Sequence, residues 1–269
     1  MTEAVLETPK DAGEKKQIKV LLCEPSSGTI DSWVYDNRKD FMVECARLEA
    51  RSNFKFGTGN TARLHVSAAR EEVARFAVAE GYDYLFMVDD DQLIPKNCFE
   101  RVYNAMQKHG ADIAAPLVTQ RVAPYNPVIW KAVDKKEFDE AGTLKSLSID
   151  HEFMHDFEPN ETVFPDAVGF GVVLISVELL KKLKAPWFYS NRHVGEDIWF
   201  CIRARREQNS KIVCDTSIKV MHMGYPIARG EYDWIKQDKE RYEKFKHLYP
   251  MTIAHEKAQN DGLVAPGLE

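Results

Sequence analysis

The stretch YLFMVDDDQLIP, residues 84–95, decides the fold prediction. Its first five residues are apolar without interruption, which is typical of a strand buried on both faces of a parallel sheet. Three carboxylates follow directly, Asp89, Asp90 and Asp91. Adjacent acids repel one another, and their charge is unfavourable beside a buried strand unless a cation or hydrogen-bond donors offset it. Alternate side chains of an extended chain point the same way, so Asp89 and Asp91 are predicted to face one site.

Such a carboxylate pair suits Mg²⁺ or Mn²⁺, whose other coordination positions are filled by water and phosphate oxygens. The predicted position, just beyond the carboxyl end of a strand, is where open α/β sheets bind ligands. The alternative is a solvated acidic turn that caps a helix beginning near Pro95. One acid is enough to cap a helix, so a metal site is the preferred interpretation of three adjacent acids.

The surrounding sequence alternates strand and helix patterns over the first half of the chain. Strands are predicted at residues 18–23, 54–56 and 112–116, and helices at residues 32–50, 67–80 and 95–109. Gly57-Thr58-Gly59-Asn60 is expected to turn the chain out of the second strand. This alternation predicts an α/β fold with a mainly parallel central sheet covered by helices.

The second half of the chain changes character. Three strand patterns, at residues 128–133, 144–149 and 162–168, are separated by charged loops, which predicts a small antiparallel addition. Pro165 would confine the third strand to an edge or a bulge. Further helices are expected at 177–183, 196–208 and 230–248, and strands at 211–214 and 218–222. In the helix at 196–208, the residues predicted to face the core are Ile198, Trp199, Cys201 and Ile202, with Arg203, Arg205 and Arg206 toward water or a ligand.

Length and composition predict one large domain. The chain has 269 residues, 44% of them hydrophobic, enough for a sizeable core. We expect a domain at 18–249, with a nucleotide-binding half at 18–118 and an acceptor half at 119–249, between a flexible tail at 1–17 and a disordered tail at 250–269. The net charge of −6 argues against a general nucleic-acid binder. The absence of a long apolar run or a signal peptide predicts a cytoplasmic protein without a membrane span, and five cysteines without CxxC spacing predict packed thiols.

Four sequence elements occur in a recognisable order. They are Asp89-x-Asp91 after the apolar strand, Val168-Gly169-Phe170-Gly171, Gly195-Glu196-Asp197 at the start of a helix, and Met221-His222-Met223-Gly224. Over roughly residues 18–225 this order resembles the GT-A glycosyltransferases, most closely the inverting family 2 type. The resemblance implies the GT-A (nucleotide-diphospho-sugar transferase) fold and transfer of a sugar from a nucleotide-diphosphate sugar to an acceptor hydroxyl. The acceptor class stays open among glycan, protein, lipid and modified nucleobase.

The resemblance also assigns residues to a metal, Mn²⁺ or Mg²⁺, on the donor diphosphate. It implies that Asp91 binds the metal, that Asp89 binds the metal or the ribose, and that Asp90 assists. His222 matches a histidine that often supplies a late metal ligand. The alternative for His222 is a packed histidine hydrogen-bonded to the backbone.

Asp197 matches the position of the catalytic base in inverting members of the family. A base must take the proton of the acceptor hydroxyl as its oxygen attacks the anomeric carbon. The alternative is helix capping, which would lower the pKa of a carboxylate and weaken it as a base. Glu196 would bind acceptor hydroxyls or exchange roles with Asp197.

The remaining implied contacts are with the donor. Glu24 and Pro25 match the start of the family's contacts to the base and ribose, and Arg70 matches an arginine that faces the nucleotide. Glu71 stands where the family has asparagine, and a surface salt bridge is the alternative for Arg70. Residues 169 and 171 would let the backbone approach the donor sugar, with a β-bulge as the alternative. Trp187, Phe188 and Tyr189 are a candidate sugar-stacking platform.

Two other functions fit the same fold. A nucleotidyltransferase would carry a basic, glycine-rich loop after the first strand, and Glu24-Pro25-Ser26-Ser27-Gly28 has no lysine or arginine. A non-catalytic carbohydrate-binding or scaffold protein could also keep the fold, but the intact Asp-x-Asp, Glu196-Asp197 and His222 argue against it.

Overall fold

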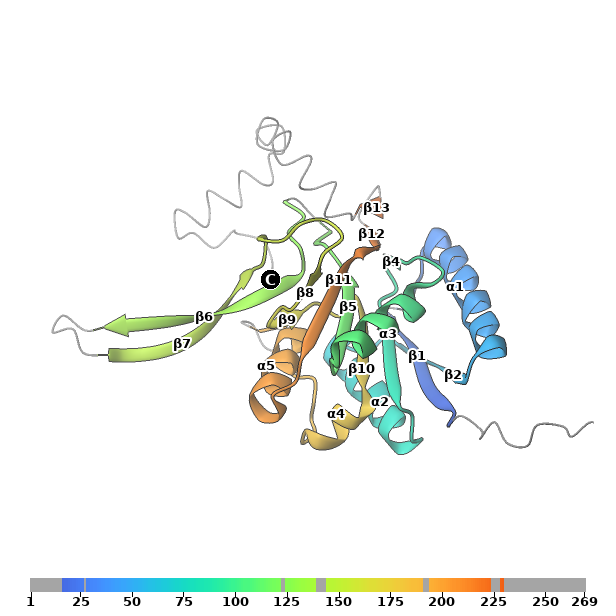
Figure 1. The fold of residues 1–269 in the computed structure, drawn as a ribbon, viewed down its shortest axis with the longest axis horizontal. Helices are drawn as coiled ribbons and strands as arrows, with labels where there is room; N and C mark the ends of the chain where they lie inside the picture. Colours follow the sequence, from blue (N-terminus) through green and yellow to red (C-terminus); the bar gives the residue numbers. More distant parts are fainter. Residues whose placement is uncertain are drawn as a thin grey trace, which may run out of the picture.

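A seven-stranded sheet forms the centre of the molecule (Figure 1). The computed structural model describes residues 16–26, 28–121, 124–138, 144–190, 194–223 and 228–229, so most of both predicted tails and the helix predicted at 230–248 lie outside the described residues. The strand order is β2 (Phe54–Ala62), β1 (Ile18–Ser26), β3 (Tyr84–Val88), β10 (Val172–Ser176), β5 (Ile113–Leu117), β11 (Ile212–Lys219) and β8 (Thr162–Val163). All run in one direction except β10, inserted between β3 and β5, and β8 at the edge.

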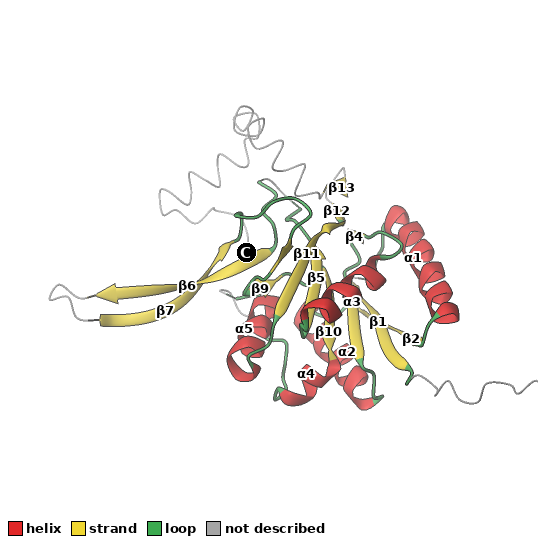
Figure 2. Cartoon of the chain, viewed as in Figure 1, coloured by secondary structure: helices red, strands yellow, loops and turns green. Residues whose placement is uncertain are grey.

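Helices cover both faces of this sheet, as Figure 2 shows. One apolar cluster joins the strands to α1 (Ser32–Arg51) and α3 (Cys98–His109). The other joins them to α2 (Val66–Ala79), α4 (Val177–Lys182) and α5 (Glu196–Gln208). On β3, Phe86 and Val88 pack in the first cluster, and Leu85 and Met87 in the second. The prediction of a mainly parallel, helix-covered sheet with this strand buried on both faces is therefore confirmed.

Two small antiparallel sheets complete the fold. β6 (Ile129–Phe138) pairs with β7 (Leu144–Phe153) and with β9 (Ala167–Val168), and the β6–β7 hairpin extends away from the central sheet in Figure 1. β12 (Met221–Met223) lies between β4 (Gln92–Leu93) and β13 (Ala228–Arg229). The predicted antiparallel addition is present. The β4–β12 pairing was not predicted, because two strands of two and three residues give no periodicity to detect.

The turn predicted at residues 57–60 was wrong. These residues continue β2, which pairs in parallel with β1 along its whole length. Gly57 has a packing reason instead, because a Cβ at this position would collide with the Tyr82 hydroxyl. Glycine in a strand often marks such a close approach.

Three element boundaries or faces also differ from prediction. The helix expected from residue 95 begins at Cys98, because Asn37 donates to the Ile94 carbonyl at 2.8 Å and accepts from its N–H at 2.9 Å, holding this segment beside α1. The strand predicted at 162–168 is two short strands, with Pro165 between them. In α5, Phe200 is fully buried and Trp199 is not part of the core.

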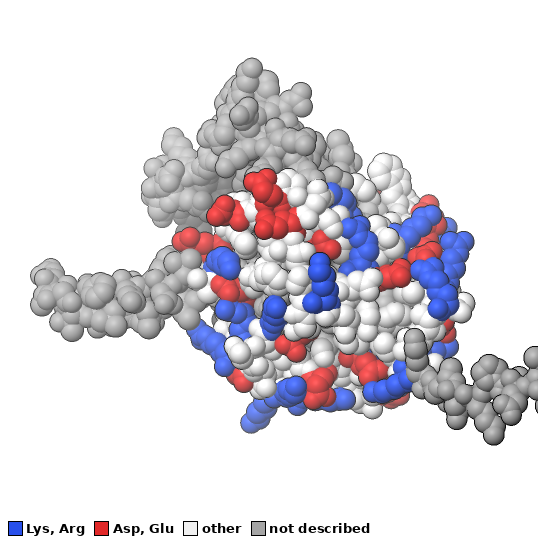
Figure 3. All heavy atoms as spheres, in the orientation of Figure 1, with Lys and Arg blue, Asp and Glu red and all other residues white. Residues whose placement is uncertain are grey.

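The cysteines fit the compositional prediction of packed thiols. All five cysteines are free and buried. Figure 3 shows lysine, arginine, aspartate and glutamate interspersed over the visible face, without a continuous basic surface among the described residues there. No helix in the described part of the chain has the length and apolar character needed to cross a membrane.

Candidate active site

Hydrogen bonds connect most of the predicted site residues at the carboxyl ends of β1 and β3. The centre of this network is Arg70, in the first turns of α2, whose side chain is only 3% exposed. Its Nη2 donates to both oxygens of Asp89, at 2.8 and 2.9 Å, and to the Phe170 carbonyl at 3.1 Å. Its Nη1 donates to Glu196 at the start of α5. A buried guanidinium therefore links the strand that carries the acids to the helix that carries the predicted base.

This network separates the roles of Asp89 and Asp91. Burial raises the pKa of Asp89 and the guanidinium of Arg70 opposes the rise, with the net pKa above its ordinary value. Asp91 instead faces His222 and Arg121. The two carboxylates of the Asp-x-Asp element thus have different partners. Both carboxylate oxygens of Asp89 already accept hydrogen bonds from Arg70.

Asp91 and His222 form the second part of the site. The pairing of β12 with β4 places His222 opposite Gln92, and His222 Nε2 lies 3.1 Å from Asp91 Oδ2. His222 Nδ1 lies 2.7 Å from the Thr119 carbonyl oxygen, which can only accept, so Nδ1 carries a hydrogen. Nε2 is then the nitrogen directed at Asp91.

The electrostatics of this pair are reciprocal. Burial works to raise the pKa of Asp91, but hydrogen bonding and charge from His222 and Arg121 lower it below its ordinary value. Burial works to lower the pKa of His222, but the bond to Asp91 raises it above its ordinary value. Among the described residues there is no cluster of three or more His, Cys, Asp and Glu side chains that could hold a metal ion. Within the described part of the chain, Asp91 and His222 are the two groups here that could bind a metal.

Glu196 and Asp197 open α5 but have different surroundings. Glu196 is 8% exposed and its carboxylate is bonded to Arg70, so this carboxylate is not free to bind the hydroxyls of an acceptor substrate. Asp197 Oδ1 accepts from the Ile198 N–H at 2.7 Å, so the capping alternative is partly correct. The hydrogen bond from Ile198 lowers the pKa of Asp197, as expected of capping, but other effects outweigh it. Burial and the neighbouring charge of Glu196 raise the pKa of Asp197 to about 6, although Arg70 opposes them.

The amino-terminal candidates lie beside an arginine that the sequence analysis missed. Arg38, on α1, donates to Glu24 at 2.6 Å and to the Asp89 carbonyl at 2.7 Å. Its place on the same face as Val34 and Phe41, at helical spacing, was a detectable sign of burial. Asp90 accepts from the Ser26 hydroxyl at 2.9 Å, and Pro25 is buried within β1.

The two glycines of the Val-Gly-Phe-Gly element serve different neighbours. A Cβ on Gly169 would collide with Val128 Cγ1, so this glycine permits close strand packing. A Cβ on Gly171 would lie 3.2 Å from the side-chain nitrogen of Gln92. Close packing within the protein therefore accounts for a glycine at both positions.

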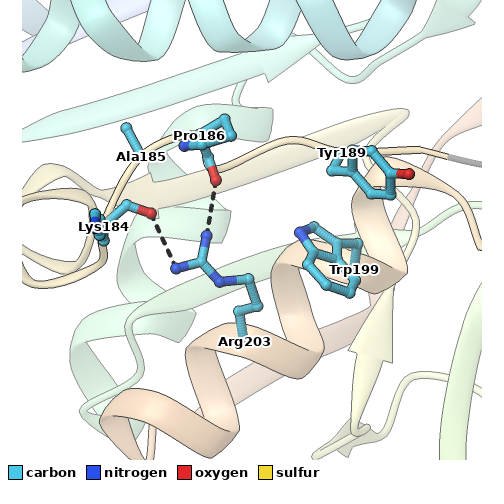
Figure 4. A pocket seen from close by; sticks show the side chains of 6 residues that line it. All are labelled: Lys184, Ala185, Pro186, Tyr189, Trp199 and Arg203. Carbon is cyan, nitrogen blue, oxygen red and sulfur yellow. Dashed lines mark hydrogen bonds between the residues drawn. The ribbon is translucent and has the colours of Figure 1, made fainter.

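The predicted aromatic platform is mostly core. Trp187 and Phe188 are buried, whereas Tyr189 is 49% exposed. Tyr189 and Trp199 line a pocket of about 400 Å³ (Figure 4) together with Lys184, Ala185, Pro186 and Arg203. Arg203 is not free toward a ligand, because it donates to the carbonyls of Pro186 and Lys184 at 2.8 and 2.9 Å. Residues 191–193, between Tyr189 and α5, lie outside the described residues.

Comparison with known protein families identifies the domain. Residues 36–161 match the family described as Glycosyl transferase family 2. This segment is a family 2 glycosyltransferase domain. The resemblance expected from the sequence is confirmed, and the family 2 domain supports glycosyltransferase activity. The match includes Arg70 and Asp89–Asp91, and it ends before Glu196, Asp197 and His222.

Among solved structures, the chain is similar to A197 from STIV, with a TM-score of 0.49 and 19% identity over 77% of this chain and 86% of that one. It is also similar to HddC from Yersinia pseudotuberculosis, with a TM-score of 0.36 and 9% identity over 78% of this chain and 95% of that one. Both similarities are distant. No curated protein matches this sequence.

Proposed function

We propose that this family 2 protein transfers a sugar from a nucleotide-diphosphate sugar to an acceptor hydroxyl, with a divalent metal and with inversion at the anomeric carbon. The observation that carries the proposal is the Asp91–His222 pair at the carboxyl end of β3, with His222 Nε2 directed at Asp91 Oδ2. A separate carboxylate, Asp197, begins the helix on the other side of the Arg70 network. The proposal thus assigns the donor to Asp91 and His222 and the acceptor to Asp197. Arg70, which bonds to Asp89 and Glu196, links the two segments that carry these acids.

The Asp91–His222 pair fits a metal. A bound metal would take the place of the Nε2 hydrogen that faces Asp91. With Nδ1 still donating to the Thr119 carbonyl, the neutral imidazole would then present its Nε2 lone pair, which is the state of a metal-binding histidine. An imidazole beside oxygen ligands suits Mn²⁺ better than Mg²⁺, and substrate diphosphate oxygens and water would complete the coordination. Such an ion, when bound, offsets the charge that develops on the departing nucleoside diphosphate.

Asp197 is the group available to act as the base. Glu196 is held by Arg70, so Asp197 is the carboxylate in the first turn of α5 without a cationic partner among the described residues. In the proposed step, Asp197 takes the acceptor hydroxyl proton as that oxygen bonds to the anomeric carbon. The bond from that carbon to the phosphate oxygen breaks on the opposite face, which inverts the configuration.

Removing the carboxylate of Asp91 is expected to abolish metal-dependent binding of the donor nucleotide. Asp91→Asn keeps the size of the side chain but removes its charge, and we expect Mn²⁺-dependent affinity for UDP or GDP to fall at least about 100-fold, the upper end of the loss caused by removing a supporting residue. Calorimetry with each nucleotide, with and without Mn²⁺, measures the effect. His222→Ala should weaken binding less, since one neutral ligand is lost. Unchanged affinity in Asp91→Asn would refute the metal assignment.

The pH dependence of transfer is expected to follow Asp197. A base works only when deprotonated, and the pKa of Asp197 is raised to about 6. At saturating donor and metal, kcat/KM for the acceptor should be constant above this pH and fall about tenfold per pH unit below it. A pH–rate profile in wild type and Asp197→Asn checks this. An acid limb that persists in the variant would belong to another group.

A further inference from the structure

The side chain of Gln92 is buried beside the proposed metal ligands and has no other evident function. It is 0% exposed. Its strand, β4, lies beside β12 (Figure 1), and the register of the pairing puts Gln92 opposite His222. Its Nε2 donates to Asp91 Oδ1 at 3.1 Å, whereas its buried Oε1 has no hydrogen-bond partner. A buried, unpaired amide oxygen is unfavourable for stability. A leucine of similar size would avoid this cost, so the amide needs another explanation.

The orientation of the amide follows from chemistry. A carboxylate oxygen only accepts hydrogen bonds, so the NH₂ group of Gln92, and not its oxygen, must face Asp91. The two oxygens of Asp91 are thereby divided. Oδ1 accepts from Gln92, and Oδ2 lies 3.1 Å from both His222 Nε2 and Arg121 Nη1. Gln92 therefore fixes which oxygen of Asp91 lies beside His222.

Gly171 provides the space for this amide. A Cβ at residue 171 would lie 3.2 Å from Gln92 Nε2 and 3.3 Å from both Gln92 Cδ and Val118 Cγ1. These distances are shorter than ordinary van der Waals contact, so the amide would have to move by a few tenths of an ångström. Such a movement would strain the 3.1 Å bond to Asp91.

We propose that Gln92 is a positioning residue that presents Asp91 Oδ2 to the divalent cation, and that the space at Gly171 allows its amide to take this position. The inference rests on the proposed function, because it assumes that Asp91 and His222 bind a metal. Residues that orient a metal ligand typically contribute about 10–100-fold in metal affinity. The same bond would favour coordination through one oxygen of Asp91.

The test measures Mn²⁺ affinity by the electron paramagnetic resonance of free Mn²⁺, in the presence of UDP and, separately, GDP. Gln92→Leu should weaken Mn²⁺ binding about 10–100-fold, and Gly171→Ala should weaken it less, because the amide is still present. Gln208→Leu, at an exposed glutamine on α5, is the matched control and should bind Mn²⁺ as the wild type does. The melting temperature of Gln92→Leu should not fall, since an unpaired buried oxygen is removed. That combination separates positioning from a general structural role.

The outcomes distinguish this inference from the proposed function. If Asp91→Asn loses Mn²⁺ and Gln92→Leu does not, the positioning role is overturned and the metal site stands. If Asp91→Asn binds Mn²⁺ as well as the wild type, the metal site fails and the inference fails with it. If Gln92→Leu loses affinity only in proportion to a lower melting temperature, Gln92 is structural and the inference is overturned.

Discussion

Replacing Asp197 with asparagine is expected to slow sugar transfer by about 10²–10⁴-fold, the usual contribution of positioned proton transfer. The variant should fold and bind donor normally, because an asparagine oxygen can still accept from the Ile198 N–H that Asp197 now caps at 2.7 Å. Single-turnover transfer to the acceptor, measured beside calorimetric donor affinity, separates these effects. The loss should appear in the transfer rate alone.

The control for this variant is Asp36→Asn, an exposed aspartate on α1 whose side chain is 69% accessible. It should transfer sugar at the wild-type rate. Near wild-type transfer by Asp197→Asn would leave Asp197 as a cap only. Retention of the anomeric configuration in the product, seen by NMR, would contradict both the inverting mechanism and the role of the base.

Replacing Arg70 with methionine is expected to lower the free energy of unfolding by about 3 kcal/mol, at the lower end of the cost of breaking a buried ion pair from one side. The lower end applies because the side chains left unpaired, Asp89 and Glu196, keep 26% and 10% exposure. Urea denaturation measures the change. The deficit should shrink as the pH is lowered, because carboxylates left without a cation have raised pKa values in the folded state and are stabilised by protonation.

Arg47→Met provides the matched comparison. The Arg47 side chain is 66% exposed and pairs with Glu44 on the surface of α1. Such pairs contribute little, so its unfolding free energy should change by no more than about 0.5 kcal/mol. If Arg70→Met and Arg47→Met have the same free energy of unfolding, the bonds of Arg70 to β3 and α5 do not stabilise the fold.

Local sequence patterns predicted the fold where burial dominated. The unbroken apolar run of β3 and the helical spacing of α2 specify burial directly, so these elements occur where expected. The helix α5 also occurs where expected, although its buried face differs from the prediction. The pattern failed at Gly57, where the glycine makes room for Tyr82 from a distant part of the chain. No local rule distinguishes that glycine from one in a turn.

The candidate site was predictable in its acids but not in their partners. Asp89 and Asp91 follow a buried strand, which marks them as candidate site residues without tertiary information. That Arg70 bonds to Asp89 and Glu196, and that His222 faces Asp91, depends on helix placement and on the register of β4 with β12. Arg38 carried a local sign, a charge on an apolar helix face, whereas Arg121 carried none.

The central claim is metal-dependent use of a nucleotide sugar. The most direct measurement incubates the wild-type protein with UDP-, GDP- and TDP-sugars in Mn²⁺, with and without EDTA, and quantifies the nucleoside diphosphate released. At least one donor should be turned over, with the turnover lost in EDTA and in Asp91→Asn. Turnover that persists undiminished in EDTA, or none with any donor from a folded protein, would contradict the claim.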